Sequence, residues 1–348
     1  MTEEKAIHFT GKRIRPFEFL VERLLAVVAF TSLLFIALIF LFVFRESSRI
    51  FSIKDAAPAA VTEEAPVYET YGDDPAETVS EHQPMTPLEE ASERKLTLGE
   101  LILGTNWRPV SLNPLYGLVP LLVGSLKVAL IALLIAGPLA VLAALFTSMF
   151  APPWAKELLK PAIEMLAGFP SVVIGFFALA ILASLCQSLM GYGFRLNAFV
   201  GGLALSLAII PVIYTISDDA LTAVPHNLVE ASLALGASKW ETVLFVVLPA
   251  ALPGIFAALL LGVGRAIGET MIVLMATGNS AIVSASPFDS VRTMAATIGA
   301  EMAEVVFGDT HYSVLFLIGV ILFIISFVLC FVAEVVIRDR LMRKFRGA

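Results

Sequence analysis

The chain of 348 residues is 58% hydrophobic and only 15% charged, and its mean hydropathy is +0.88. A water-soluble core cannot bury that much apolar surface, so the composition excludes an ordinary soluble domain and predicts an integral membrane protein. The net charge of −7 is unevenly spread, because much of the acid lies in one segment and both ends are basic. The net charge therefore identifies no class of partner, and we expect no nucleic acid to bind.

The N-terminal part begins with a polar, basic stretch, residues 1–23, which is followed by an unbroken apolar run at 24–44. That run is long enough to cross a bilayer core of roughly 30 Å. No small-residue cleavage site follows it, so the sequence predicts a retained membrane anchor rather than a signal peptide that is removed.

Residues 45–106 have the opposite character. Between Ser52 and Lys95 the segment is rich in proline and acidic residues and contains few large aliphatic side chains. Such a segment cannot bury enough apolar area to offset the entropy lost on ordering. We expect a disordered extracytoplasmic loop, and a folded binding domain is the alternative.

A core of further apolar segments occupies residues 107–340, and a short basic tail, 341–348, follows it. Gly137-Pro138 interrupts the first of these segments and Gly168 to Ser171 interrupts the second, so both are expected to bend. With the anchor, they predict an all-α integral membrane protein with six transmembrane helices. The five added crossings are 118–150, 161–187, 198–217, 254–277 and 312–338.

The basic residues of the short flanks orient these crossings. The N-terminal flank, the connection with Lys156 and Lys160, and the C-terminal tail all fall on one side if there are six crossings. The positive-inside rule makes that side cytoplasmic. We therefore expect both termini and the loop 218–253 in the cytoplasm, with the acidic segment and residues 278–311 outside.

The cytoplasmic loop is too polar to span a membrane and too patterned to be a plain connection. Pro225 can begin a helix, Glu230 lies in its first turns, where the helix dipole favours a carboxylate, and Gly236 can end it in the left-handed conformation. A second helical run then reaches Leu248-Pro249, where the chain is expected to turn into the next membrane helix. The pattern predicts a short helix lying across the membrane face.

Arg265 and Glu269 are the charged residues of the apolar run 254–277. Because they are four residues apart, they share one face of the predicted helix. An ion at that depth costs at least a few kcal/mol in lipid unless it is paired or faces water, so both side chains should point inward. Gly264 and Gly268 form a small-xxx-small pair that would let a neighbouring helix approach closely.

Two interpretations of this pair stay open. The planar guanidinium of Arg265 suits a tetrahedral oxyanion, so it could meet a phosphate-like anion while Glu269 holds it when the pathway is empty. Alternatively, the two residues form a structural ion pair that only fixes helix packing. Ser171, which follows a helix-breaking proline, could likewise offer its hydroxyl or a freed backbone group to an anion, or could simply mark a packing kink.

Enzymatic motifs are missing from the sequence. It has no G-x-x-x-x-G-K-[ST] loop, no H-E-x-x-H pair and no G-x-S-x-G elbow. Cys186 and Cys330 lie inside apolar runs, which indicates buried thiols rather than a disulfide or a zinc site. We expect no catalytic residue, metal site or cofactor in this chain.

The cytoplasmic loop resembles the signature loop of ABC importer permeases, although a serine replaces its second alanine and a valine replaces its isoleucine. In that family the loop forms a coupling helix that docks into a groove of the ATPase subunit. The residues that carry this resemblance are Glu230, Ala231, Ser232, Gly236, Val246, Leu248 and Pro249.

The whole segment from Trp107 to Arg340 resembles the phosphate-specific ABC permeases, and two of its motifs point to the PstC-like subunits. The matching groups are Asn113 to Gly117, Gly124 to Leu126, Glu164 to Val173, Gly175-Phe176, Arg265 to Thr270 (with Gly268) and Thr277 to Asn279. In this family the arginine and glutamate of the RAxGE motif are implicated in phosphate passage. The resemblance carries that role onto Arg265 and Glu269.

The resemblance implies a bacterial inner-membrane permease subunit of an ATP-driven phosphate importer. It also implies the partners: a homologous PstA-like permease, two PstB-like ATPase subunits and an extracytoplasmic PstS-like phosphate-binding protein, all around a lipid bilayer. A permease for molybdate, tungstate or sulfate, a secondary anion transporter and a membrane scaffold or sensor remain as alternatives.

Overall fold

The computed structural model describes residues 16–51, 98–111 and 114–332. The predictions for the acidic loop and for the basic tail lie outside the described residues. The helices are α1 (Pro16–Ser48), α2 (Leu98–Leu103), α3 (Val119–Leu145), α4 (Pro153–Leu166), α5 (Ser171–Phe177), α6 (Ala183–Met190), α7 (Ala198–Thr222), α8 (His226–Ala234), α9 (Lys239–Thr242), α10 (Leu248–Gly268), α11 (Met271–Ala276), α12 (Met294–Glu301) and α13 (Thr310–Val332), with a 3-10 turn at Arg49–Phe51. A small antiparallel hairpin pairs β1 (Trp107–Arg108) with β2 (Leu115–Tyr116).

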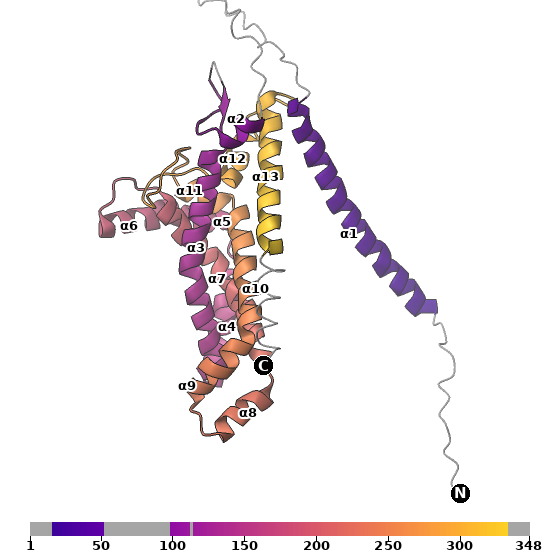
Figure 1. Cartoon of the computed structure of the whole chain (residues 1–348), viewed down its shortest axis with the longest axis vertical. Helices are drawn as coiled ribbons and strands as arrows, with labels where there is room; N and C mark the ends of the chain where they lie inside the picture. Colours follow the sequence, from indigo (N-terminus) through magenta and orange to yellow (C-terminus); the bar gives the residue numbers. More distant parts are fainter. Residues whose placement is uncertain (1–15, 52–97, 112–113, 333–348) are drawn as a thin grey trace, which may run out of the picture.

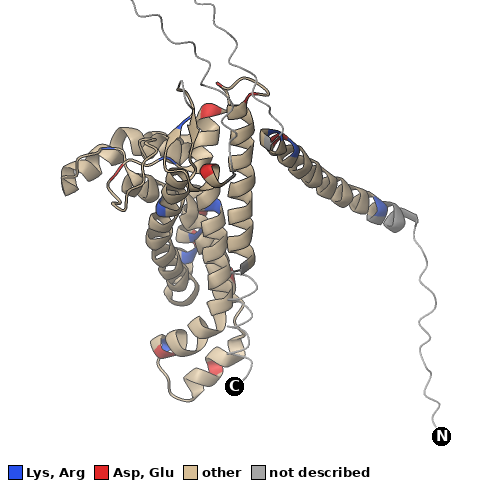
Figure 2. Ribbon diagram, turned by 45° about the horizontal axis from the view of Figure 1, so that its top comes forward, with Lys and Arg blue, Asp and Glu red and all other residues tan. Residues whose placement is uncertain are grey.

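The all-α membrane architecture with six crossings is confirmed. Among the described residues, six helices are long and apolar enough to span a membrane: Arg23–Ser48, Val119–Phe150, Ser171–Met190, Ala198–Thr222, Lys239–Gly268 and Thr310–Phe331. Figure 2 shows α13 without charged residues along its drawn length, while the charges of α1 lie near its two ends. This distribution is the one a bilayer-spanning helix requires.

Three of these spans contain a π-helical segment. Phe146–Phe150 extends α3, Ala178–Leu182 joins α5 to α6, and Val243–Val247 joins α9 to α10. Each segment hydrogen-bonds from residue i to i+5 and so accommodates one extra residue without breaking the helix. The spans are therefore continuous, although their faces change direction at these points.

The second predicted crossing, 161–187, is wrong at its start. Helix α4 ends at Leu166, the chain turns at Ala167 to Phe169, and α5 begins after Pro170. A proline has no amide hydrogen and restricts the residue before it, so the Gly-Phe-Pro-Ser sequence separates two helices instead of bending one. Consequently α4 is a separate helix and the crossing starts at Ser171.

The predicted crossing 254–277 is wrong at both ends. Its helix is continuous from Lys239, because the π-helical segment Val243–Val247 runs directly into α10, which contains both Pro249 and Pro253. The chain therefore does not turn at Leu248-Pro249. At the other end α10 stops at Gly268, and α11 is a separate short helix.

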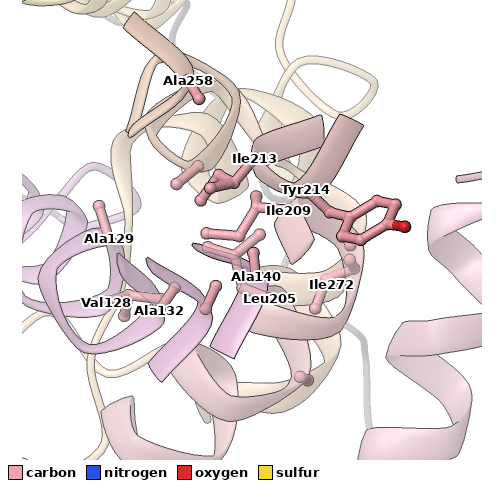
Figure 3. Close-up of a cluster of buried hydrophobic side chains, with 14 of the residues drawn as sticks. Val128, Ala129, Ala132, Ala140, Leu205, Ile209, Ile213, Tyr214, Ala258 and Ile272 are labelled. Atoms are coloured by element: carbon pink, nitrogen blue, oxygen red, sulfur yellow. The ribbon is translucent and has the colours of Figure 1, made fainter. Parts of the chain in front are cut away.

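The core is formed by α3, α7 and α10, with α11 against them. Figure 3 shows Leu205, Ile209 and Ile213 of α7 beside small residues of α3 and Ala258 of α10. Glycines bring these backbones close: a Cβ on Gly202 would lie 2.5 Å from Ile131, and one on Gly254 would lie 2.4 Å from Ala220. Such small-residue seams are how membrane helices pack without a hydrophobic driving force between them.

The two ends of this bundle carry different elements. Helices α8 and α9 lie at one end, and α2 and α12 lie at the other (Figure 1). Helix α1 leans away from the bundle and meets α13 through the ring pairs Phe40–Phe323 and Phe42–Phe316, whose centroids are 4.3 and 5.7 Å apart. The aliphatic side chains of α1 are exposed in this chain, so they face lipid or another subunit.

Candidate functional site

Arg265 lies in the last turn of α10, and its side chain is exposed on the surface of this chain. Among the described residues it forms no ion pair and no hydrogen bond through its guanidinium. The guanidinium is therefore available to a group outside the part of the chain that the structure describes.

Glu269 does not pair with Arg265, so the predicted arrangement of the two on one helix face is wrong. The backbone of Glu269 is extended, with φ −70° and ψ 130°, because the helix has ended at Gly268. Its Oε1 instead accepts hydrogen bonds from the backbone amides of Thr270 and Met271, both at 3.2 Å. The carboxylate thus satisfies amides that would otherwise be unpaired at the start of α11.

Of the two glycines predicted to form a small-residue pair, only Gly264 has a neighbouring helix close to it among the described residues. A Cβ on Gly264 would lie 3.4 Å from Sγ of Cys330 on α13, whereas a Cβ on Gly268 would meet nothing within 4 Å. Thr270 packs toward α12, since a Cβ on Gly299 would lie 2.5 Å from its Cγ2. Within this chain, Gly268 therefore leaves open space one turn from the guanidinium.

Ser171 is the first residue of α5 and is half-buried. The same helix packs against α11, because a Cβ on Gly175 would lie 3.1 Å from the carbonyl oxygen of Met271. Helix α5 and the segment that carries Glu269 therefore form one packed unit.

The motif around Gly124 serves the packing of the connection between α11 and α12. A Cβ on Gly124 would lie 2.2 Å from the carbonyl oxygen of Arg292, so only glycine fits there. Ser125 Oγ accepts a hydrogen bond from the amide of Met294 at 2.9 Å and donates to the carbonyl of Leu121 at 2.8 Å. These residues fix the start of α12 against α3.

The motif Thr277 to Asn279 folds the same connection back on itself. Gly278 and Asn279 have positive φ angles of 82° and 53°, which glycine and asparagine tolerate best. The carbonyl of Thr277 accepts hydrogen bonds from Ser290 Oγ and from the amide of Val291, both at 3.0 Å. The motifs Gly124 to Leu126 and Thr277 to Asn279 thus stabilise the fold of the connection between α11 and α12.

A mostly buried charge cluster at the α12 end was assigned no role by the sequence interpretation. Glu301 Oε1 accepts hydrogen bonds from Arg292 Nη1 at 2.6 Å and Trp107 Nε1 at 3.1 Å, and its Oε2 lies 2.9 Å from His311 Nε2. Burial raises the pKa of Glu301, but these donors and the neighbouring positive charges outweigh it, so its pKa lies below the ordinary value. Burial together with Asp309 and Glu301 raises the pKa of Tyr116 to about 12.

Helix α8 agrees with the predicted coupling helix in position and ends. It follows Pro225, and Gly236 has a φ of 91°, the left-handed conformation expected of a helix stop. Glu230 lies in its second turn, so the prediction that the helix dipole stabilises this carboxylate is wrong, because that effect falls off beyond the first turn. Ala231 is exposed, and Ser232 Oγ lies 2.9 Å from Thr242 Oγ1 of α9.

A second buried carboxylate lies near the α8 end and was also missed. Asp218, in α7, is 5% exposed, and its Oδ2 lies 3.0 Å from Nζ of Lys160 on α4. Its Oδ1 accepts a hydrogen bond from Thr147 Oγ1 at 3.4 Å, and Thr147 in turn accepts one from Tyr214 at 2.9 Å. The adjacent acidic pair at the end of an apolar run was the signal in the sequence that could have identified this site.

Comparisons with known proteins place this geometry in context. Residues 136–344, which include both α8 and Arg265, match the family described as "Binding-protein-dependent transport system inner membrane component". The chain is 38% identical to "Probable ABC transporter permease protein YqgH" of Bacillus subtilis, over 66% of this chain and 74% of that protein. It is 33% identical to "Phosphate transport system permease protein PstC" of Xylella fastidiosa, over 69% and 78% of the two chains, and 34% identical to the protein of that name from Haemophilus influenzae, over 66% and 77%.

Proposed function

We propose that this chain, which belongs to the family of binding-protein-dependent transport system inner membrane components, is the permease subunit of an ATP-driven importer of inorganic phosphate. The similar proteins of Xylella fastidiosa and Haemophilus influenzae are named phosphate transport system permeases, which supports phosphate as the substrate. The proposal assigns no catalytic residue to this chain and leaves ATP and Mg to a partner subunit.

The unpaired guanidinium of Arg265 is the observation that carries the proposal. It lies in a membrane span, is exposed on this chain and makes no hydrogen bond or ion pair with another described residue. A cation facing lipid there would cost at least a few kcal/mol, so the side chain must front a hydrated pathway. Its planar set of donors matches two oxygens of a tetrahedral oxyanion, and its charge is permanent.

A second permease subunit, PstA-like and homologous, would close this pathway. The open space beside Gly268 and the exposed side chain of Arg265 would then face the partner across the pathway. Thr270 and Ser171 belong to the same lining in this proposal, since α5 and the start of α11 pack together. A PstS-like binding protein would deliver phosphate to the end that carries α12 and the hairpin.

Two PstB-like ATPase subunits would dock on the α8 end of the permease pair. Helix α8 offers exposed Leu228 and Leu233 to such a partner, and Leu235, directly after the helix, is also exposed. The cytoplasmic side follows from the basic flanks, and the location of α8 opposite α12 supports it (Figure 1). Both termini are cytoplasmic in this proposal, in the inner membrane of a bacterium.

Movement of α8 would reach Arg265 through one continuous helix, Lys239–Gly268. The hydrogen bond between Ser232 and Thr242 links α8 to α9, and α9 continues without a break to Gly268. Closure of the ATPase pair would therefore tilt α10 and change the side of the membrane to which Arg265 is accessible. Leu248 and Pro249 lie in the first half of this helix, between α9 and Arg265, so the movement would pass through them.

Replacement of Arg265 by Gln tests the proposal. In proteoliposomes containing both permeases, the ATPase and the binding protein, R265Q should lose ATP-dependent uptake of radioactive phosphate while co-purification with the ATPase is unchanged. The control is R23Q, because Arg23 is exposed at the start of the α1 span, and α1 leans away from the bundle that carries the pathway. Normal uptake by R265Q would overturn the anion contact.

The same vesicles test the identity of the substrate. Unlabelled molybdate, tungstate and sulfate should compete with phosphate poorly if phosphate is the substrate, and strong competition by one of them would reassign it. Uptake driven by an ion gradient without ATP would instead indicate a secondary transporter.

A further inference from the structure

We propose that the ion pair between Lys160 and Asp218 transmits movement of α8 to α5 and α11, so that the pair is a positioning element for the substrate site. The inference rests on the proposed function of the chain as a permease. It concerns two residues that lie away from Arg265 and from the docking face of α8.

Asp218 connects three elements at one point. It belongs to α7, its Oδ2 lies 3.0 Å from Lys160 on α4, and its Oδ1 accepts a hydrogen bond from Thr147 in the π-helical end of the α3 span. Only 5% of Asp218 is exposed, whereas the side chain of Lys160 is 44% exposed. The hydrogen bond and the charge of Asp218 raise the pKa of Lys160, so the lysine stays charged.

The connection from α8 to Asp218 is short and stiff. Helix α7 ends at Thr222, one turn after Asp218, and Thr222 Oγ1 donates to the Asp218 carbonyl at 2.9 Å. The buried Val224 and then Pro225 follow, and α8 begins directly after them. A force on α8 therefore acts on the turn of α7 that carries the carboxylate.

Helix α4 depends on this contact more than a buried helix would. Ala155 is the buried residue of α4, and most of its other side chains are exposed or half-buried. Lys156 adds a hydrogen bond to the carbonyl of Ser148 at 2.8 Å, which binds α4 to the end of the α3 span and not to α7. The ion pair between Lys160 and Asp218 thus joins α4 to α7.

From α4 the movement has a direct route to the substrate site. A short turn from Ala167 to Pro170 joins α4 to α5, and Gly175 of α5 packs against the backbone of Met271 and Ile272. The amide of Met271 is bound by Glu269, four residues after Arg265. Displacement of α4 would therefore shift the carboxylate that is bound at the start of α11, directly after the helix of Arg265. Packed elements in contact of this kind can carry coupling between sites.

The first test measures coupling in the reconstituted transporter. The ratio of phosphate transported to ATP hydrolysed should fall by about three- to tenfold in K160M and in D218N, and the double variant should be no worse than either single variant. Matched controls are K156M on the same helix and D219N, the exposed neighbour of Asp218, and both should keep the native ratio. An unchanged ratio in K160M and D218N would overturn the proposal, even if the rates of phosphate transport and of ATP hydrolysis both fall because the variants are less stable.

The second test does not depend on the substrate. Spin labels on the exposed Leu130 of α3 and Val172 of α5 report the position of α5, and ATP should change their separation in the complete complex in nanodiscs. K160M should abolish that change while ATP hydrolysis continues. The transmission role would be refuted if K160M showed the same change in label separation as the unaltered complex, or if the unaltered complex showed no change. If the label separations change as expected but phosphate is not taken up, only the identity of the substrate is refuted.

Discussion

Two arginines on either side of α11 have opposite surroundings. Arg292 donates to Glu301 at 2.6 Å within a cluster that also includes Trp107 and His311. Arg265 has no hydrogen-bonding or ionic partner in the part of the chain that the structure describes. A cation that is mostly buried with its carboxylate fixes the structure, whereas a cation left without one in a membrane span has its partner elsewhere.

The largest effect expected from this contrast is on stability. Replacement of Arg292 by Gln leaves the mostly buried Glu301 without its cation, which should cost about 3 kcal/mol and lower the melting temperature by several degrees. R265Q should melt at the native temperature, because it removes no contact with a described residue. Thermal unfolding followed by tryptophan fluorescence in detergent makes the comparison, and equal melting of the two variants would contradict it.

A smaller loss is expected for Gly124→Ala. The new Cβ would lie 2.2 Å from the carbonyl oxygen of Arg292, so the backbone before α12 must shift, at a cost of about 2 kcal/mol. The measurement is the same melting experiment, together with proteolysis of the connection 278–293. Native melting and native protease resistance would show that this contact is not tight.

Acidification should lower stability through Glu301, by less than the loss of Arg292 does. Because the folded-state pKa of Glu301 is below its ordinary value, its stabilising contribution is complete above the unfolded pKa of about 4.3 and is lost as the pH falls through the folded pKa. The melting temperature of the native protein should fall over that range. E301Q should have a lower but flatter profile, and identical slopes would exclude Glu301 as the source.

The smallest effect is expected for Gly268→Ala. Nothing lies within 4 Å of the added Cβ, so stability should change by less than about 0.5 kcal/mol. Phosphate uptake should nevertheless decrease if this space belongs to the pathway, since a methyl group would enter it beside Arg265. Full uptake in this variant would place the pathway on another face of α10.

The sequence was sufficient for features that local chemistry determines. Apolar runs of membrane length predicted the six crossings, and Pro225 and Gly236 predicted the ends of α8, because a bilayer and a helix end impose their requirements on adjacent residues. The Pro170 break was recognised but underestimated. Its neighbour Gly168 and the chain turn made it a boundary between two helices and not a bend.

The sequence was insufficient where distant segments decide the structure. The end of α10 at Gly268 was not predicted: Glu269 bonds the next two backbone amides there, and α11 packs against α5 while Thr270 packs toward α12. Glu301 is bonded to a tryptophan 194 residues away, and Asp218 to a lysine 58 residues away. A periodicity argument compares residues within a few turns of one helix. It therefore identified Glu269 as a partner for Arg265 and overlooked the contacts of Glu301 with Trp107 and of Asp218 with Lys160.

The π-helical segment Val243–Val247 has a consequence for how this family of sequences can vary. It accommodates one extra residue between the part of the helix that contacts α8 and the part that carries Arg265. Deletion of that residue would leave an unbroken α-helix but would rotate Arg265 by about 100° relative to α8. A single-codon deletion in this segment is therefore expected to turn the guanidinium out of its pathway.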